Sequence, residues 1–197
     1  MTLSRSTKRS RLLVKVIARN NMRFVALDTE TTGLNKSGNG AICRGHRIIE
    51  IGCVEVIDGV ITGRVFHRYV NPGVKVEEKA VKIHGITDVF LTGKPRFEDI
   101  VEGLLEFIGG SPIVIHNAKF DVPFLNQEFK LLSDDKGLRG RVFHIIDTLE
   151  LAREMFPGRS NTLDSLCERY GVKGRGGGVH GALSDAIILA KIAILMM

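Results

Sequence analysis

Two spacings of apolar residues alternate along this chain, and together they predict an α/β fold. Continuous apolar stretches and β-rich runs, typical of strands, occur at 24–27, 47–57, 60–70, 112–116 and 142–146. The first is apolar without alternation, as in a central strand covered on both faces. Asp58-Gly59 separates the second run from the third, and Asp-Gly between two β-rich runs predicts a hairpin.

Helical spacing fills most of the segments between and after these runs. Helices are predicted at about 76–82, at 97–108, from Asp121 onward, at 148–156, at 163–170 and from about 182 to the end. Because a helix lies between the fourth and fifth strands, those strands should be parallel. The order β-β-β-α-β-α-β-α-α-α predicts a mixed five-stranded sheet with an antiparallel edge, flanked by helices. The Gly-rich segment 174–178 predicts a flexible loop.

Composition favours one globular domain. The chain has 197 residues, 44% of them hydrophobic and 25% charged, which is enough to bury a full core. Its three cysteines lack a CxxC pair and suggest neither a disulfide framework nor a zinc site. The apolar run 186–197 is short, contains Lys191 and follows Asp185, so we expect a buried helix and no membrane span.

The net charge of +6 comes from one end of the chain. Residues 1–22 contain six basic residues and no acidic one, which leaves 22 basic and 22 acidic residues in 23–197. A neutral body attracts nucleic acid weakly over long range. We expect residues 1–22 to be a basic, disordered extension outside a domain at 23–197. Residues 1–21 are open to three interpretations: an organelle transit peptide, a basic arm, or sequence upstream of a start at Met22.

Two carboxylates follow the first strand directly. Asp28 and Glu30 are two residues apart, so on a strand their side chains share one face. Their repulsion requires either a proton on one of them or a cation between them, and oxygen ligands suit Mg²⁺ or Mn²⁺ better than zinc. The alternative is that Asp28-Thr29 begins a turn and Glu30 is solvated.

Two further acidic residues and a histidine are candidates for the same site. Asp121 follows the fourth strand, although Asp before Val-Pro also predicts a helix N-cap. Asp185 lies in an apolar helix, where an unpaired carboxylate would cost several kcal/mol and a metal would compensate it. His180 can meet Asp185 only from the loop before the helix, since on one helix they would lie ~140° apart. A solvent-exposed His180 is the alternative.

Three motifs containing these residues occur in a characteristic order: DTETTG at 28–33, HNAKFD at 116–121 and HGALSD at 180–185. In this respect the chain resembles the DEDDh 3′→5′ exonucleases. The resemblance continues through GHRIIEIGCVEV at 45–56, IHGIT at 83–87 and MFPGRSNTLDSLCERY at 155–170. It covers nearly all of 23–197 and is strongest to the proofreading (epsilon) subunits of bacterial DNA polymerase III.

The resemblance implies a ribonuclease-H-like fold and a metal-dependent exonuclease that releases nucleoside 5′-monophosphates from DNA 3′ ends. Two divalent cations, Mg²⁺ or Mn²⁺, would be held by the four carboxylates Asp28, Glu30, Asp121 and Asp185, with Asp28 bridging both. Such ions, ~3.5–4 Å apart, clamp the attacking and leaving oxygens of an in-line displacement. His180 would take a proton from the attacking water.

The resemblance also implies contacts with the terminal nucleotides. The candidates are Thr31, Ile83, His84, Asn117 and Phe120, with core packing as the alternative for Ile83 and Phe120. Relatives tend to place a sugar-contacting Glu five residues before His84, whereas this chain has Lys79 there and Glu78 beside it. Which of the two would approach the sugar is left open.

The implied partners are a DNA 3′ end, the polymerase catalytic subunit of the replicase and, as a further candidate, a small accessory subunit, all in the bacterial cytoplasm. Relatives carry a clamp-binding tail after the last helix, and because this chain stops at Met197 we expect it to lack that tail. One alternative function is a stand-alone nuclease that trims RNA 3′ ends. Another is a non-catalytic module that stabilises a polymerase, although the presence of all five catalytic-type residues argues against it.

Overall fold

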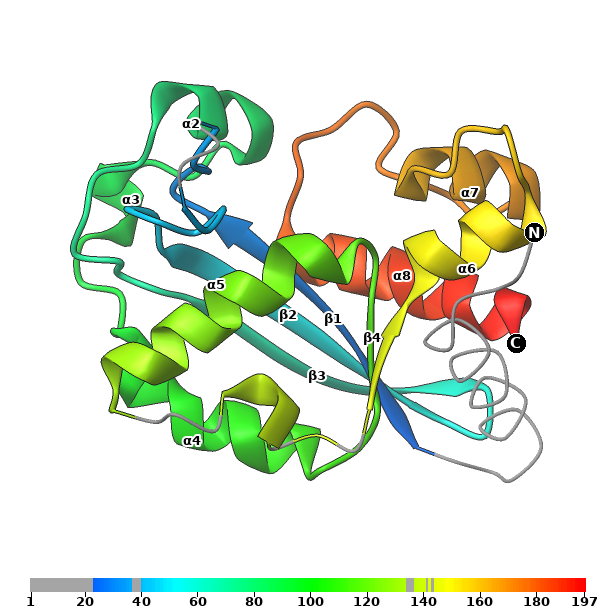
Figure 1. Ribbon diagram of the computed structural model, residues 1–197, viewed down its shortest axis with the longest axis horizontal. Helices are drawn as coiled ribbons and strands as arrows, with labels where there is room; N and C mark the ends of the chain where they lie inside the picture. The colour runs from blue at the N-terminus through cyan, green and yellow to red at the C-terminus, as the bar shows by residue number, and fades with distance from the viewer. Residues whose placement is uncertain (1–22, 37–39, 134–136, 141, 143) are drawn as a thin grey trace.

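A five-stranded mixed sheet in the order β3-β2-β1-β4-β5 forms the centre of the protein (Figure 1). The strands are β1 (Phe24–Thr31), β2 (Ile48–Ile57), β3 (Val60–Tyr69), β4 (Ile113–Ile115) and β5 (Ile145–Asp147). This computed structural model describes residues 23–36, 40–133, 137–140, 142 and 144–197. The predicted extension at 1–22 therefore lies outside the described residues, and the boundary at residue 23 stays a prediction.

The predicted antiparallel edge is confirmed. β2 pairs antiparallel with both β1 and β3, whereas β4 is parallel to β1 and β5 is parallel to β4. Asp58 and Gly59 join β2 to β3 with positive φ angles of 55° and 73°, as a tight hairpin turn requires. The fifth strand is 145–147 rather than 142–146, because β4 offers only three residues and pairs them with Ile145 through Asp147.

Helices cover both faces of this sheet. They are α2 (Glu78–His84), α3 (Asp88–Leu91), α4 (Phe97–Ile108), α5 (Ala118–Leu131), α6 (Thr148–Met155), α7 (Leu163–Tyr170) and α8 (Ala182–Met196), with a 3₁₀ turn at Leu138–Gly140. The predicted start of one helix at Asp121 is wrong, because α5 begins three residues earlier, after Asn117 in the left-handed region at φ 70°. The single-turn α3 was not predicted, since four residues are too few for a periodic signal.

Alternate residues of β1 point to different cores. Phe24 and Ala26 face the layer of α6, α7 and α8, and Val25 and Leu27 face α4 and α5. Figure 1 shows α4 and α5 together on one side of the sheet and α8 on the other. By the same alternation, Asp28 and Glu30 belong to the α8 side, and Thr29 belongs to the α5 side.

Gly52 on β2 lets α8 approach the sheet closely. A Cβ atom at Gly52 would lie 2.3 Å from the backbone of Ala182 and Leu183, so any larger residue would push the start of α8 away. Gly52 is also the register partner of Asp28. The first turn of α8, which contains Asp185, is therefore held against the part of the sheet where Asp28 lies.

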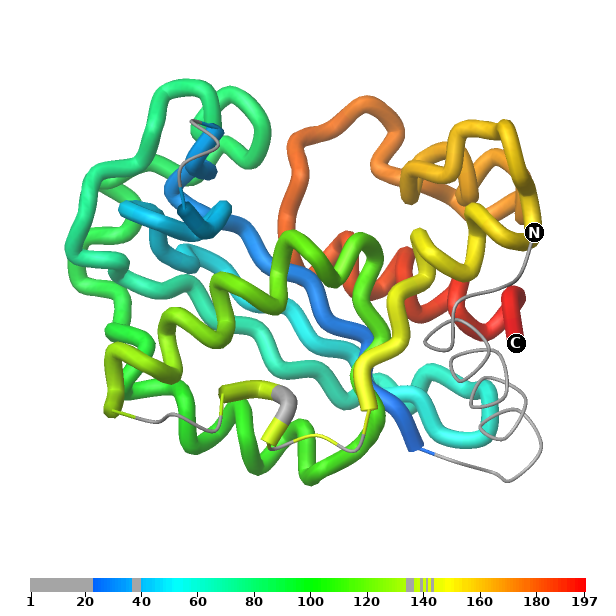
Figure 2. The backbone as a smooth tube through the Cα atoms, viewed as in Figure 1, coloured from blue at the N-terminus to red at the C-terminus, as the bar shows by residue number. Residues whose placement is uncertain are grey.

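The segment between α7 and α8 arches outward from the sheet, and in Figure 2 it lies between the α2 region and α7. It ends at Gly181, where α8 begins. No helix in the described part of the chain is long and apolar enough to cross a membrane.

Candidate active site

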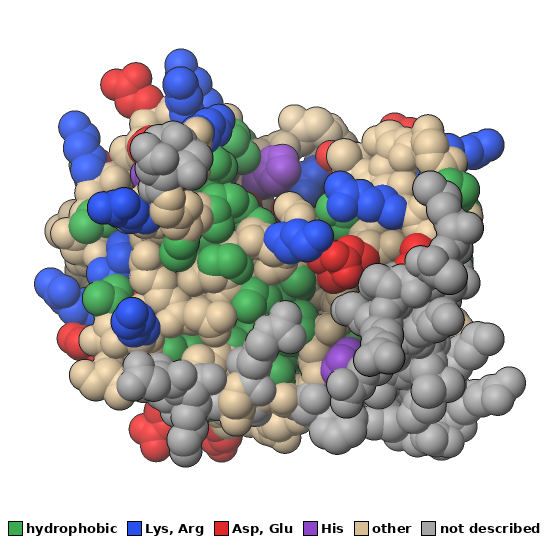
Figure 3. Space-filling model, viewed as in Figure 1, with side chains coloured by type: hydrophobic (Ala, Val, Ile, Leu, Met, Phe, Trp, Pro, Cys, Tyr) green, Lys and Arg blue, Asp and Glu red, His purple; other side chains and the backbone are tan. Residues whose placement is uncertain are grey.

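One large pocket of about 1280 Å³ lies at the end of β1. Its walls come from the end of β1, α2, the start of α5, the α6–α7 region and the loop before α8. In the space-filling view, the opening lies between the α2 side and the α7 side, with basic side chains beside it (Figure 3). The pocket thus lies at the carboxyl end of a central strand, where ligand sites form in open α/β sheets.

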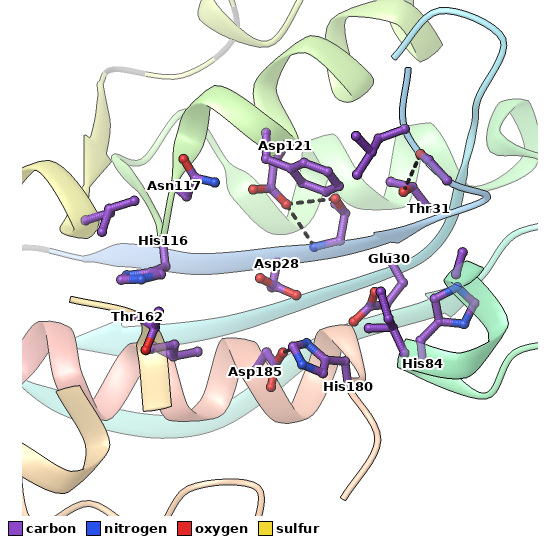
Figure 4. Close-up of a pocket in the computed structure, with 18 of the residues that line it drawn as sticks. Asp28, Glu30, Thr31, His84, His116, Asn117, Asp121, Thr162, His180 and Asp185 are labelled. Atoms are coloured by element: carbon purple, nitrogen blue, oxygen red, sulfur yellow. Dashed lines mark hydrogen bonds and ion pairs between the residues drawn. The ribbon is translucent and has the colours of Figure 1, made fainter. Parts of the chain in front are cut away.

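The two carboxylates of β1 point into this pocket from the face that α8 covers. Figure 4 shows Asp28 and Glu30 on the same side of β1, directed toward Asp185 and His180. Both residues belong to β1 itself, which runs to Thr31. The alternative in which Asp28-Thr29 begins a turn is therefore wrong.

Asp121 reaches the pocket from α5. Its Oδ1 accepts hydrogen bonds from the Thr29 backbone N at 3.1 Å and from Thr29 Oγ1 at 2.8 Å. The side chain is buried in the first turn of α5. Asp121 is therefore not the N-cap of this helix, and its carboxylate is held against β1 by the residue between Asp28 and Glu30.

Asp185 and His180 come from the opposite wall. His180 lies in the loop before α8, which is the only position from which it was expected to reach Asp185. Its Nδ1 is 3.5 Å from Asp185 Oδ2. The backbone N of His180 donates to the Ile83 carbonyl at 3.0 Å, which ties the loop to α2. The side chain of His180 is 44% exposed, so it faces the pocket rather than the core.

Burial disfavours the charged forms of three of these carboxylates, and repulsion between carboxylates adds to it for Asp28 and Glu30. Burial, reinforced by the charges of Asp121, Asp185 and Glu30, raises the pKa of Asp28 well above its usual range. Burial, followed by the charges of Asp185 and Glu50, raises the pKa of Glu30 to about 8. Burial also raises the pKa of Asp121 to about 7, against the hydrogen bonds from Thr29.

This donor set fits a divalent cation. Ligand atoms of Glu30, His180 and Asp185 lie within 4.8 Å of one another, and Asp28 and Asp121 lie in the same pocket. Carboxylate oxygens are the ligands that Mg²⁺ and Mn²⁺ prefer. A cation here would also favour the charged forms that burial and mutual repulsion oppose.

The raised pKa of Glu30 predicts how the metal-free protein responds to pH. Its folded pKa of about 8 lies above the ordinary value for an unfolded glutamate, about 4.3. The folded state thus holds a proton that the unfolded chain has released, so this group lowers stability progressively as pH rises from about 4.3 to 8. We expect Glu30→Gln to stabilise the protein in EDTA more at pH 8 than at pH 5, as measured by urea unfolding. An equal effect of the substitution at both pH values would contradict the assignment.

Arg175 is a pocket residue that sequence reasoning missed. It donates from Nε to Asp185 Oδ1 at 2.6 Å and from Nη2 to Asp185 Oδ2 at 2.7 Å. The sequence predicted that the buried charge of Asp185 must be compensated, and the guanidinium of Arg175 supplies one such compensation. Ligation of a metal by Asp185 stays a prediction. The only sequence signal was an arginine within the Gly-rich segment 174–178, where an exposed position was the simpler expectation.

Glu50 is a second residue that was missed. It is the register partner of Glu30 and is buried, with its Oε2 accepting from the Ala182 backbone N at 3.1 Å. Its Oε1 lies 2.7 Å from His67 Nε2. Glu50 therefore caps the N-terminus of α8, the helix that carries Asp185. A single glutamate within the apolar run RIIEIGC was the available signal.

All seven candidate substrate contacts line the same pocket: Thr31, Glu78, Lys79, Ile83, His84, Asn117 and Phe120. Ile83 is 51% exposed, so core packing does not explain it. Phe120 is partly buried against the core, with its ring 5.2 Å from that of Phe124, so packing remains part of its role. Contact of these residues with a nucleotide stays a prediction.

Comparison with known proteins agrees with this geometry. The model of the exonuclease family RNase T matches residues 25–193. The chain is 48% identical over 177 residues to a protein of Buchnera aphidicola subsp. Schizaphis graminum, covering 90% of this chain and 75% of that protein. It is 45% identical over 174 residues to a protein of Escherichia coli K12, covering 88% and 71%. Both relatives are described as DNA polymerase III subunit epsilon.

Solved structures give the same fold. The nuclease domain of 3′hExo, a DEDDh family member bound to rAMP, matches with a TM-score of 0.74 and 16% identity, covering 90% of this chain and 92% of that one. Exonuclease X in complex with 5′ overhanging duplex DNA matches with a TM-score of 0.63 and 29% identity, covering 88% and 90%. The predicted ribonuclease-H-like arrangement of a mixed sheet flanked by helices is confirmed.

Proposed function

The chain belongs to the RNase T exonuclease family, and on that premise we propose that it is the 3′→5′ proofreading exonuclease of a bacterial replicative DNA polymerase. The observation that carries this proposal is one pocket containing Asp28, Glu30, Asp121, Asp185 and His180, on a chain 48% identical over 90% of its length to an epsilon subunit. The reaction is hydrolysis of the last phosphodiester of a DNA 3′ end, with release of a nucleoside 5′-monophosphate.

The four carboxylates would hold two divalent cations, Mg²⁺ or Mn²⁺. When bound, these ions supply a Lewis acid for the phosphoryl oxygen and lower the pKa of water. Asp28 is the central ligand in this proposal, because it lies between Asp121 on one side and Asp185 on the other (Figure 4). Thr29 orients Asp121 through its two hydrogen bonds, and Glu50 fixes the helix that carries Asp185.

His180 accepts the proton of the attacking water. Its position on the rim of the carboxylate cluster and its 44% exposure leave the imidazole open to the pocket, and histidine is the commonest general base. The hydrogen bond from its backbone N to Ile83 places it beside α2. In this proposal α2 also carries the substrate contacts Ile83 and His84, together with Glu78 and Lys79 at the sugar.

The remaining contacts come from the other walls. Thr31 at the end of β1, and Asn117 and Phe120 at the start of α5, would lie along the terminal nucleotides. We place the protein in the bacterial cytoplasm, in association with the catalytic subunit of the replicase and with a small accessory subunit as a further candidate. Organelle targeting by residues 1–21 is the alternative location.

A substrate comparison tests the function. We expect the protein with Mg²⁺ to shorten a DNA primer with a mispaired 3′ end stepwise from that end, faster than the matched primer and faster than a single-stranded RNA of equal length and sequence. Nucleoside 5′-monophosphates should accumulate in proportion to the number of nucleotides removed from the primer. Faster digestion of the RNA would instead indicate a nuclease that trims RNA 3′ ends. Digestion of neither substrate would indicate a non-catalytic, polymerase-stabilising module.

A further inference from the structure

Arg175 forms the shortest ion pairs of the catalytic pocket among the described residues. Its guanidinium makes two hydrogen bonds to Asp185, at 2.6 and 2.7 Å, and a third from Nη1 to Asp164 Oδ1 at 2.6 Å. The side chains of Arg175 and Asp185 are only 10% and 3% exposed. Bidentate, charge-assisted bonds of this kind are among the strong hydrogen bonds of proteins.

This ion pair occupies the same oxygens that a metal would need. Both carboxylate oxygens of Asp185 accept a hydrogen bond from Arg175, so a cation that coordinates Asp185 would share these oxygens with a guanidinium of like charge. The repulsion between the two positive charges favours loss of the ion pair when a cation binds. The positive charge of Arg175 also opposes the rise in the pKa of Asp28 and Glu30. Arg175 thus supplies part of the compensation that a bound cation would otherwise provide.

The glycines beside Arg175 allow its backbone to change conformation, so that its side chain can move out of the pocket. Gly176 and Gly177 have positive φ angles of 64° and 79°, and a Cβ atom at either position would meet nothing within 4 Å. Gly174 precedes Arg175, and the backbone N of Gly178 bonds to the Arg175 carbonyl at 3.2 Å. His180, by contrast, is tied to Ile83 on α2. A rearrangement of 174–178 can therefore occur while His180 keeps its anchor.

We propose that Arg175 is a built-in counter-ion that pairs with Asp185 when no metal is bound, and that divalent cations displace it by charge repulsion as they complete the active site. The inference rests on the proposed function, since it concerns the same metal site. Exchange of Arg175 for a cation keeps the charge of the buried Asp185 carboxylate compensated at every stage. An uncompensated charge at this position would be strongly destabilising. Metal binding is thereby coupled to release of the segment 174–178 from the pocket.

Calorimetric titration of Mg²⁺ and Mn²⁺ into Arg175→Gln tests this coupling. The variant should bind metal at least about tenfold more tightly than the wild type, because a bond between charged groups no longer has to be broken. Arg153→Gln is the matched control, since Arg153 lines the same pocket but is exposed. Loss of its charge should change the affinity less than about threefold, because exposed charges are screened. Equal effects of the two substitutions, or weaker binding by Arg175→Gln, would overturn the proposal.

Limited proteolysis of the wild type gives a second measurement that needs no variant. Trypsin cleaves after arginine, and the Arg175 side chain is held in the pocket. Mg²⁺ should therefore accelerate cleavage between Arg175 and Gly176, as followed by mass spectrometry and normalised to cleavage elsewhere in the chain. Unchanged or slower cleavage at this bond would overturn the coupling but leave the proposed function intact. If the wild type bound no metal at all, the metal-dependent function itself would fail.

Discussion

Replacing Asp28 with Asn should abolish exonuclease activity and at the same time raise the melting temperature of the metal-free protein. Asp28 is partly buried on β1, and the charges of Asp121, Asp185 and Glu30 all oppose its own. Without metal, the amide removes one member of a repelling cluster. With metal, the variant loses the central ligand and hence several kcal/mol of transition-state stabilisation, a fall on the order of 10³-fold or more in turnover.

Asp185→Asn is the informative companion to this variant. It should be just as inactive, but it should lower the melting temperature in EDTA, because Arg175 would lose its bidentate partner and keep only the single hydrogen bond to Asp164 for a largely buried charge. Differential scanning fluorimetry in EDTA and a gel that follows shortening of a DNA primer in Mg²⁺ measure the two effects. A wild-type digestion rate for Asp28→Asn would refute the metal assignment.

Replacing His180 with Ala should separate catalysis from metal binding. General-base catalysis contributes typically about 10²–10⁴-fold, so single-turnover hydrolysis should slow by roughly that factor. Although His180 lies near Glu30 and Asp185, hard cations prefer oxygen ligands, so Mg²⁺ affinity measured by calorimetry should barely change.

A second histidine provides the control for His180. His46 also lines the pocket, where its Nε2 lies 3.9 Å from Glu77 Oε1, and it is not part of the group formed by Glu30, His180 and Asp185. His46→Ala should therefore reduce turnover far less than His180→Ala. If His180→Ala recovered full turnover at high Mg²⁺, His180 would be a support of the metal site rather than the base.

The features that the sequence predicted correctly are those that depend on neighbours along the chain. The alternation on β1 placed Asp28 and Glu30 on one face because strand geometry is local. The hairpin at Asp58-Gly59 followed from turn chemistry in the same way. Helix geometry also required that His180 lie in the loop before α8 if it was to meet Asp185, and it lies there. The meeting of Asp121 and Asp185 with the β1 carboxylates came instead from the family resemblance.

The features that the sequence missed depend on contacts between distant segments. Arg175 and Asp185 lie ten residues apart, and their pairing requires the loop after α7 to fold back over the start of α8. Glu50 caps α8 across 132 residues of sequence, which no local pattern can reveal. The start of α5 was misplaced because Asn117 adopts a left-handed conformation, and its backbone N and that of Ala118 bond to Asp147 from β5.

Calorimetric titration of Mn²⁺ into the wild-type protein, beside Asp28→Asn, is the most direct test of the claim that this carboxylate cluster is a two-metal catalytic centre. We expect the wild type to bind two ions per chain, and we expect Asp28→Asn, which lacks the shared ligand, to lose the paired binding. Two ions bound with unchanged affinity by Asp28→Asn, or no binding by the wild type, would contradict that claim.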